Sequence, residues 1–116
     1  MNQYKSGLEG EALAEKYLCQ QGMTLLERRY RGADGEIDLI MMEQDTVVFV
    51  EVKCRPDGQK GSGLMAVTAS KQRRMTHAAQ KYLILREWTE VSVRFDVVEI
   101  THDGLLHIPN AFMAKQ

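Results

Sequence analysis

Two β-prone segments joined by a short polar turn constrain this chain more than any other feature of its sequence. The first is Glu36-Ile37-Asp38-Leu39-Ile40-Met41-Met42, and the second is the valine-rich stretch Thr46–Cys54. Side chains alternate along a strand, so Glu36 and Asp38 share one face of the first segment. For the same reason Glu51 and Lys53 share one face of the second. Charged groups therefore gather at one end of each face.

The connection between the two segments predicts how these charged groups pair. Gln44-Asp45 has the length of a two-residue hairpin turn, which would place Asp38 opposite Glu51 and Glu36 opposite Lys53. Directly opposite residues on one face of a sheet have Cβ atoms about 5 Å apart. We therefore expect two carboxylates side by side on one face.

The remaining pattern predicts a mixed α/β domain. Apolar residues at helical spacing predict a helix from about Gln3 to Gln21, and a second helix from a Ser70 cap to about Arg86. Strands are expected at Met23–Arg31, Glu36–Met42, Thr46–Cys54, Val91–Thr101 and Leu105–Pro109, and an exposed, mobile loop at Arg55–Gly63. The predicted order is α-β-β-β-α-β-β, with the first three strands forming an antiparallel meander.

Composition limits the classes of protein that this chain can belong to. Its 116 residues fit one domain, and 44% hydrophobic with 27% charged residues is typical of a soluble globular protein. Apolar runs such as Val47–Val50 are far shorter than the roughly 20 residues that span a bilayer, and the N-terminus has no apolar signal core. Cys19 and Cys54 lack metal-binding spacing and fit a reducing compartment. We expect a cytoplasmic protein without a membrane partner.

The paired carboxylates predict a metal site. Carboxylates this close repel each other unless a proton or a cation lies between them. Asp38 and Glu51 offer oxygen donors, which suit Mg²⁺ or Mn²⁺, and Lys53 would orient a nucleophile or stabilise charge on a phosphate. Glu11 is a further acid, at the centre of the apolar stripe of the first helix. A satisfied ion pair of Asp38, Glu51 and Lys53 at a strand end would be the structural alternative, but three acids at special positions favour phosphodiester hydrolysis.

These motifs resemble the bacterial YraN-like family, which is related to archaeal Holliday-junction resolvases and to restriction endonucleases. The resemblance covers almost the whole chain and is carried by Gly10-Glu11, Gly35-Glu36-Ile37-Asp38-Leu39-Ile40, Phe49-Val50-Glu51-Val52-Lys53-Cys54-Arg55, Lys71-Gln72-Arg73, Arg94-Phe95-Asp96-Val97-Val98 and His107-Ile108-Pro109-Asn110-Ala111-Phe112. It implies that residues 1–116 form a single restriction-endonuclease-like domain of the PD-(D/E)xK superfamily, a mixed β-sheet flanked by helices.

The resemblance also implies roles for individual residues. Asp38 and Glu51 would be metal ligands and Lys53 the catalytic lysine, and Glu11 matches a helix glutamate that approaches the metal in resolvases. Two positions depart from the pattern: Ile37 stands where the superfamily often has proline, and Arg29 stands where relatives commonly carry asparagine.

Local charge supplies the candidate nucleic-acid contacts, because a net charge of −1 gives no global attraction to phosphate. The candidates are Arg29, Arg31, Arg55, Lys71, Gln72, Arg73 and Arg74, although solvent exposure would explain Gln72 equally well. The three histidines, His77, His102 and His107, share no constellation, and we expect solvent-facing or structural roles for them.

The sequence thus predicts a metal-dependent endonuclease that acts on nucleic acid, with DNA favoured over RNA and with branched or otherwise structured DNA among the candidate substrates. Two alternatives stay open: a non-catalytic nucleic-acid-binding module on a nuclease scaffold, and a protein-interaction domain whose acids are structural. Symmetric cleavage of a junction needs two sites, so a homodimer would fit the first hypothesis.

Overall fold

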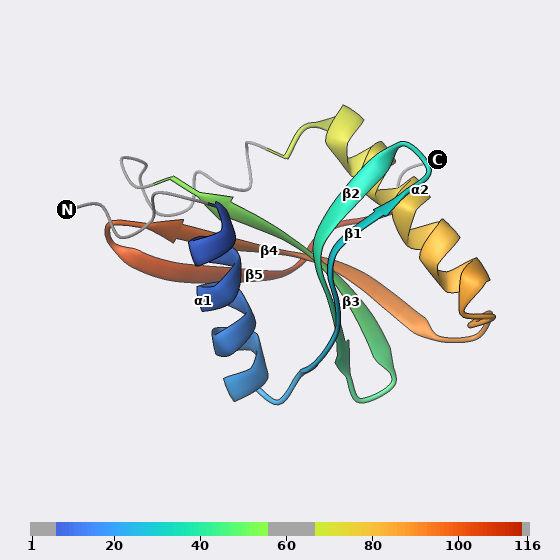
Figure 1. Cartoon of the computed structure of the whole chain (residues 1–116), viewed down its shortest axis with the longest axis horizontal. Helices are drawn as coiled ribbons and strands as arrows, with labels where there is room; N and C mark the ends of the chain where they lie inside the picture. The colour runs from blue at the N-terminus through green and yellow to red at the C-terminus, as the bar shows by residue number, and fades with distance from the viewer. Residues whose placement is uncertain (1–6, 56–66, 115–116) are drawn as a thin grey trace.

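The computed structural model describes residues 7–55 and 67–114. Within these residues, two helices and five strands follow one another along the chain (Figure 1). In chain order they are α1 (Gly7–Gln20), β1 (Thr24–Gly32), β2 (Gly35–Glu43), β3 (Thr46–Cys54), α2 (Ala69–Leu85), β4 (Ser92–Thr101) and β5 (Gly104–Phe112). Neither described helix has the length and apolar character that crossing a bilayer requires.

The strands form one mixed sheet in the order β1-β2-β3-β4-β5. The first three pair antiparallel, which confirms the predicted meander, whereas β3 and β4 are parallel and β4 and β5 are antiparallel. A parallel pair needs a long crossover, and α2 lies in that connection. The sequence pattern alone did not indicate that β3 and β4 are parallel neighbours.

Each helix packs on its own face of the sheet. Leu18 of α1 lies in a buried cluster with Val48, whereas Tyr82 of α2 lies in a second cluster with Val47, on the opposite face. Because side chains alternate along β3, neighbouring valines enter different clusters. The sheet therefore separates two environments, one beneath α1 and one beneath α2.

The predicted hairpin turn is correct, but the predicted pairing of the charged residues needs correction. Glu43 pairs with Thr46 across Gln44-Asp45, and the β2–β3 ladder runs in this register only as far as Leu39 opposite Val50. If the ladder continued in this register, Asp38 would pair with Glu51 and Glu36 with Lys53, yet neither pair belongs to the ladder. The physical reason is that the Asp38 carboxylate accepts the Val52 backbone N–H at 2.7 Å, so a side chain takes the place of a backbone partner.

Two predicted boundaries are wrong by more than one residue. Thr68, not Ser70, caps α2, and its Oγ1 accepts the Lys71 backbone N–H at 3.2 Å; both residue types cap helices well, so sequence could not choose between them. β5 continues past Pro109 to Phe112, because an edge strand tolerates a residue without an N–H. The first residues of the predicted N-terminal helix, and all of the predicted loop except Arg55, lie outside the described residues.

Candidate functional site

A cleft of about 690 Å³ opens between α2 and the turn that joins β1 to β2. Its lining includes Arg31, Asp38, Glu51, Lys71, Arg74 and Lys81. Gly35 brings the turn close to α2, since a Cβ at this position would lie 2.2 Å from the Arg74 carbonyl oxygen. His77 adds a contact from α2, with its Nδ1 3.1 Å from Asp34 Oδ1 of the turn. One wall of the cleft is thus fixed by backbone packing.

Asp38 lies where the sheet pairing is interrupted on both sides. The β1–β2 pairing passes from Arg28/Leu39 to Tyr30/Ile37 and omits Arg29 and Asp38. Arg29 has φ +51°, a left-handed conformation that is uncommon for a residue other than glycine, asparagine or aspartate. Such irregularities in a sheet often redirect a side chain next to a functional site. Here the interruption leaves the Asp38 carboxylate against β3.

The Asp38 and Glu51 carboxyl groups are hydrogen-bonded neighbours, as the parity argument predicts. Burial, the charge of Glu51 and this hydrogen bond together raise the pKa of Asp38 from 3.8 to about 8, although the Val52 N–H opposes the shift. Glu11 adds a smaller repulsion. Resistance to ionisation is expected for a carboxyl group that is held beside a second carboxylate. A cation bound between the two groups would stabilise both in their charged form.

Glu51 is 2% exposed and is neutralised by two lysines. Lys53 Nζ lies 3.2 Å from Glu51 Oε2, and Lys71 Nζ, from the first turn of α2, contacts the same oxygen. Burial works against the Lys71 ammonium, but its hydrogen bond to Glu51 and the charge of Glu51 outweigh this effect and raise the pKa of Lys71. Sequence reasoning predicted Lys53 beside Glu51, but it assigned Lys71 only to nucleic acid.

Glu11 approaches this site without joining it. Its carboxylate pairs with Arg29 Nε at 2.9 Å, and its side chain is 15% exposed. Within residues 7–55 and 67–114, no three His, Cys, Asp or Glu side chains are grouped so that they could hold a metal ion together. The structure therefore brings Asp38, Glu51 and Lys53 together and leaves Glu11 in a separate ion pair.

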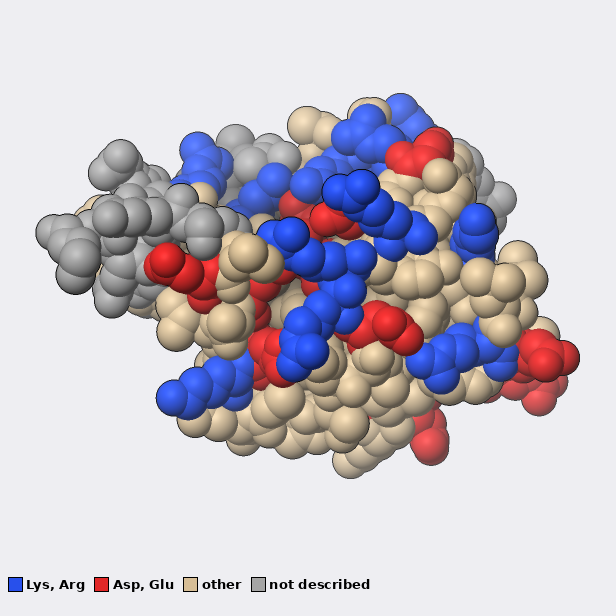
Figure 2. All heavy atoms as spheres, viewed as in Figure 1, with Lys and Arg blue, Asp and Glu red and all other residues tan. Residues whose placement is uncertain are grey.

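The other predicted basic residues differ in their surroundings. Arg31 pairs with Glu36 at 2.9 Å, so Glu36 does not take the predicted place beside Lys53. Gln72 Nε2 donates to the Val67 carbonyl at 3.0 Å, which ties it to the start of α2. Arg55 and Arg73 are exposed, and Arg74 lines the cleft. Figure 2 shows Lys and Arg side chains gathered around acidic side chains near the middle of the face that is drawn.

Comparison with known proteins connects this geometry to a family. The sequence profile of the uncharacterised protein family UPF0102 matches residues 10–100. The chain belongs to the UPF0102 family. The matched range contains the residues that meet in the site, from Asp38 to Lys71, and the predicted YraN-like membership is thereby confirmed.

Relatives match over nearly their full length. A UPF0102 protein of Geobacter metallireducens is 43% identical over 91% of this chain and 90% of its own. One from Saccharophagus degradans is 44% identical over 97% of this chain and 96% of its own. A third, from Nitrosomonas europaea, is 46% identical over 91% of this chain and 92% of its own. This UPF0102 chain is thus similar to whole proteins rather than to one segment of a larger protein.

Glu99 is a fully buried acid near the site that is not among the predicted site residues. It lies beside Lys53 in the parallel β3–β4 register, and paired residues in a sheet point to the same face. A signal was present in the sequence, because Glu99 interrupts the apolar run Val97-Val98 and Ile100. Charged residues are almost never fully buried without a partner.

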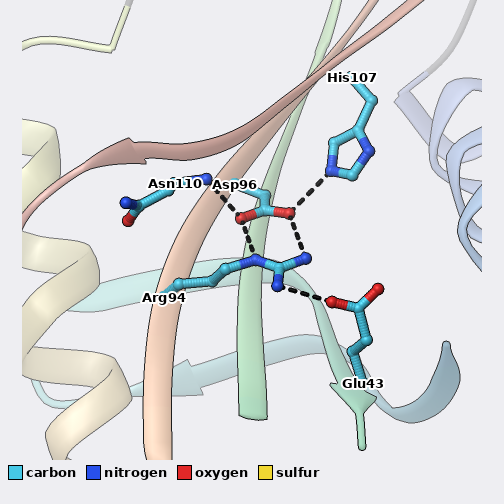
Figure 3. Close-up of polar contacts among 5 residues, drawn as sticks. All are labelled: Glu43, Arg94, Asp96, His107 and Asn110. Carbon is cyan, nitrogen blue, oxygen red and sulfur yellow. Dashed lines mark hydrogen bonds and ion pairs between the residues drawn. The ribbon is translucent and has the colours of Figure 1, made fainter.

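A second polar cluster surrounds Asp96 (Figure 3). The Asp96 carboxylate accepts from Arg94 Nε at 3.0 Å and from the Asn110 backbone N–H at 2.9 Å, and His107 Nε2 lies 2.7 Å from its Oδ2. Arg94 also pairs with Glu43 at 2.7 Å. Burial opposes ionisation of Asp96, but these bonds together lower its pKa.

The same cluster gives His107 the structural role that the sequence predicts. Its ring packs edge-on against Tyr17 of α1, with 5.6 Å between ring centroids, so the cluster belongs to the α1 side of the sheet. The other two histidines are exposed or half-buried, and each lies beside an aspartate: His77 near Asp34 and His102 near Asp103.

Proposed function

We propose that this UPF0102 chain is a metal-dependent nuclease that hydrolyses phosphodiester bonds in DNA, including branched or structured DNA, on a restriction-endonuclease-like core. One observation carries the proposal: Asp38 and Glu51 are adjacent carboxyl groups at a cleft, with Lys53 on the second carboxylate. Positive side chains at the same cleft suit a phosphate-bearing substrate.

The donor set fits Mg²⁺ or Mn²⁺. Asp38 and Glu51 would hold the ion through carboxylate oxygens. The charge of the ion would relieve the repulsion between the two carboxylates, which together with burial raises the pKa of Asp38. Bound there, the ion would supply an activated water and charge stabilisation on the phosphate. Glu11 would become a further ligand only after leaving Arg29.

The remaining chemistry belongs to side chains of the chain. Lys53 lies 3.2 Å from Glu51 Oε2, and from there its ammonium would orient a nucleophile and stabilise negative charge on the transferring phosphoryl group. Arg31 and Arg74 line the same cleft and would hold flanking phosphates without reading base sequence. The β1–β2 turn, packed against α2 by Gly35, would keep these contacts in place.

A second candidate is a nucleic-acid-binding module without catalysis. The observation that favours it is the pairing of the Glu51 carboxylate with two lysines, Lys53 and Lys71. The basic side chains at the cleft would serve this function equally well, because phosphate contacts need no metal.

A cleavage panel separates the two candidates. Linear, flapped and four-way-junction DNA would be incubated with the wild-type protein in Mg²⁺ or Mn²⁺, beside Glu51→Gln, which keeps the shape of the side chain and removes its charge. We expect cleavage that falls about 100-fold or more in Glu51→Gln, as for loss of a principal electrostatic group. Glu90→Gln, at an exposed position, is the matched control and should cleave like the wild type. Binding of the panel without cleavage by the wild-type protein would select the binding module instead.

A further inference from the structure

We propose that Lys71 is a displaceable counter-ion that couples metal binding to phosphate binding, an inference that rests on the proposed nuclease function. In the structure its ammonium holds Glu51 Oε2. When a divalent cation binds to Asp38 and Glu51, Lys71 leaves that oxygen and contacts a phosphate of the substrate in the cleft.

The contacts of Glu51 show why the two cations compete. Both lysines lie on a single oxygen, Oε2, of a carboxylate that is almost fully buried. A metal ion also needs an oxygen of this carboxylate, and two ammonium groups together with a divalent ion would crowd positive charge around one acid. Tight binding of the ion therefore requires one lysine to leave the Glu51 carboxylate.

The position of each lysine indicates which one leaves. Lys53 lies two residues from Glu51 on the same strand, so their pairing is local to β3. Lys71 instead comes from α2, its side chain is 32% exposed, and it lines the cleft through which an ion would enter. Its flexible four-carbon stem lets the ammonium move without a change in the backbone.

The helix gives Lys71 a reason to seek an anion after release. Lys71 lies in the first turn of α2, which contains no acidic residue. The positive end of a helix dipole disfavours a cation there, by about 0.3–1 kcal/mol at exposed sites, and it favours a phosphate. Glu51 offsets this repulsion where Lys71 contacts it, and a substrate phosphate would offset the repulsion after Lys71 has moved.

Mn²⁺ titration calorimetry on matched variants tests the displacement. Lys71→Met keeps the length of the stem and removes the charge, so we expect it to bind Mn²⁺ at least about fivefold more tightly than the wild type, since no ammonium has to be displaced. Lys81→Met removes the same charge from the lining of the same cleft, and within the described residues Lys81 has no ion pair with Glu51. It should stay within about twofold of the wild type. Lys71→Arg retains the charge and should also bind like the wild type.

Binding of a phosphorothioate DNA duplex, followed by fluorescence anisotropy, tests the coupling. Saturating Mn²⁺ should tighten binding to the wild-type protein and should tighten binding to Lys71→Met much less, because the released ammonium is missing. Thermal unfolding of every variant confirms that it is folded.

Three results would count against us in different ways. In the first, the wild-type protein binds Mn²⁺ and Glu51→Gln does not, but Lys71→Met binds Mn²⁺ no more tightly than the wild type. This result overturns the role of Lys71 and leaves the nuclease proposal standing. In the second, Lys81→Met binds Mn²⁺ as much more tightly than the wild type as Lys71→Met does. The effect would then be one of general electrostatics, and the proposed role of Lys71 would again be overturned. If neither the wild-type protein nor Lys71→Met binds Mn²⁺, the metal-dependent function fails and this inference fails with it.

Discussion

A buried aspartate, Asp96, and a half-buried one, Asp38, on opposite faces of one sheet show how surroundings determine charge. Asp96 meets Arg94, His107 and a backbone N–H, and its pKa is lowered. Asp38 has one backbone N–H and a neighbouring carboxylate, and its pKa is raised to about 8. The first environment stabilises an ionised group and so supports the fold, whereas the second leaves a site that binds a proton at neutral pH and would exchange it for a cation.

The raised pKa of Asp38 predicts a pH dependence of stability. The folded protein binds this proton more tightly than the unfolded chain, so the stabilisation from Asp38 is fully present below about pH 4 and is lost as pH rises through about 8. Between about pH 5 and 7 the free energy of unfolding of the wild type should fall relative to that of Asp38→Asn, by up to about 1.4 kcal/mol per pH unit.

Urea denaturation across this pH range measures the difference between the two proteins. Asp45→Asn, at an exposed position in the β2–β3 turn, is the matched control and should follow the wild type. Parallel pH profiles for the wild type and Asp38→Asn would show that Asp38 ionises normally in the folded protein.

At the scale of elements, the local parts of the site could be predicted and the non-local parts could not. The length of the Gln44-Asp45 turn fixes the β2–β3 register, and β-propensity gives the bounds of Thr46–Cys54. The left-handed backbone of Arg29 has no signal in the residue itself, since arginine adopts this conformation less readily than asparagine does. The contact between Lys71 and Glu51 depends on how α2 crosses the sheet, which periodicity does not report.

Packing between α1 and β3 is also set by one residue without a side chain. A Cβ at Gly10 would lie 1.8 Å from Cys54 Sγ. Gly10→Ala should therefore lower the free energy of unfolding by about 1–3 kcal/mol through overpacking, even though alanine favours a helix by about 1 kcal/mol.

A double-mutant cycle isolates this contact. In a Cys54→Ala background the sulfur is absent, so Gly10→Ala should become neutral or stabilising, and urea denaturation of the four proteins gives the coupling energy. If Gly10→Ala cost the same with and without the sulfur, the proximity of α1 to β3 would not be the cause.

At the scale of the whole molecule, the sheet divides support from proposed chemistry. The α1 side holds the Asp96 cluster. In it, Asp96 of β4 contacts His107 and the Asn110 backbone of β5, as well as Arg94 of its own strand. The α2 side holds the cleft, its acid pair and its basic side chains. This division predicts that metal binding and nucleic-acid binding can be altered separately, because among the residues that line the cleft Glu51 is buried and Asp38 half-buried, whereas Arg74 is exposed.

Charge reversal at Arg74 tests this separation. Arg74 lines the cleft, and its side chain bonds to Ser70 at 3.2 Å rather than to an acid of the site. Arg74→Glu should weaken binding to DNA of any sequence and lower the slope of log affinity against log salt concentration by about 1, because one phosphate contact releases about one condensed counterion. Mn²⁺ affinity should change by less than about twofold, whereas Glu51→Gln should abolish it. Lys16→Glu, an equal change of charge at an exposed position of α1, is the control and should leave the salt slope unchanged. An identical loss of DNA affinity in Lys16→Glu and Arg74→Glu would mean that net charge alone governs binding, and that this cleft is not where DNA binds.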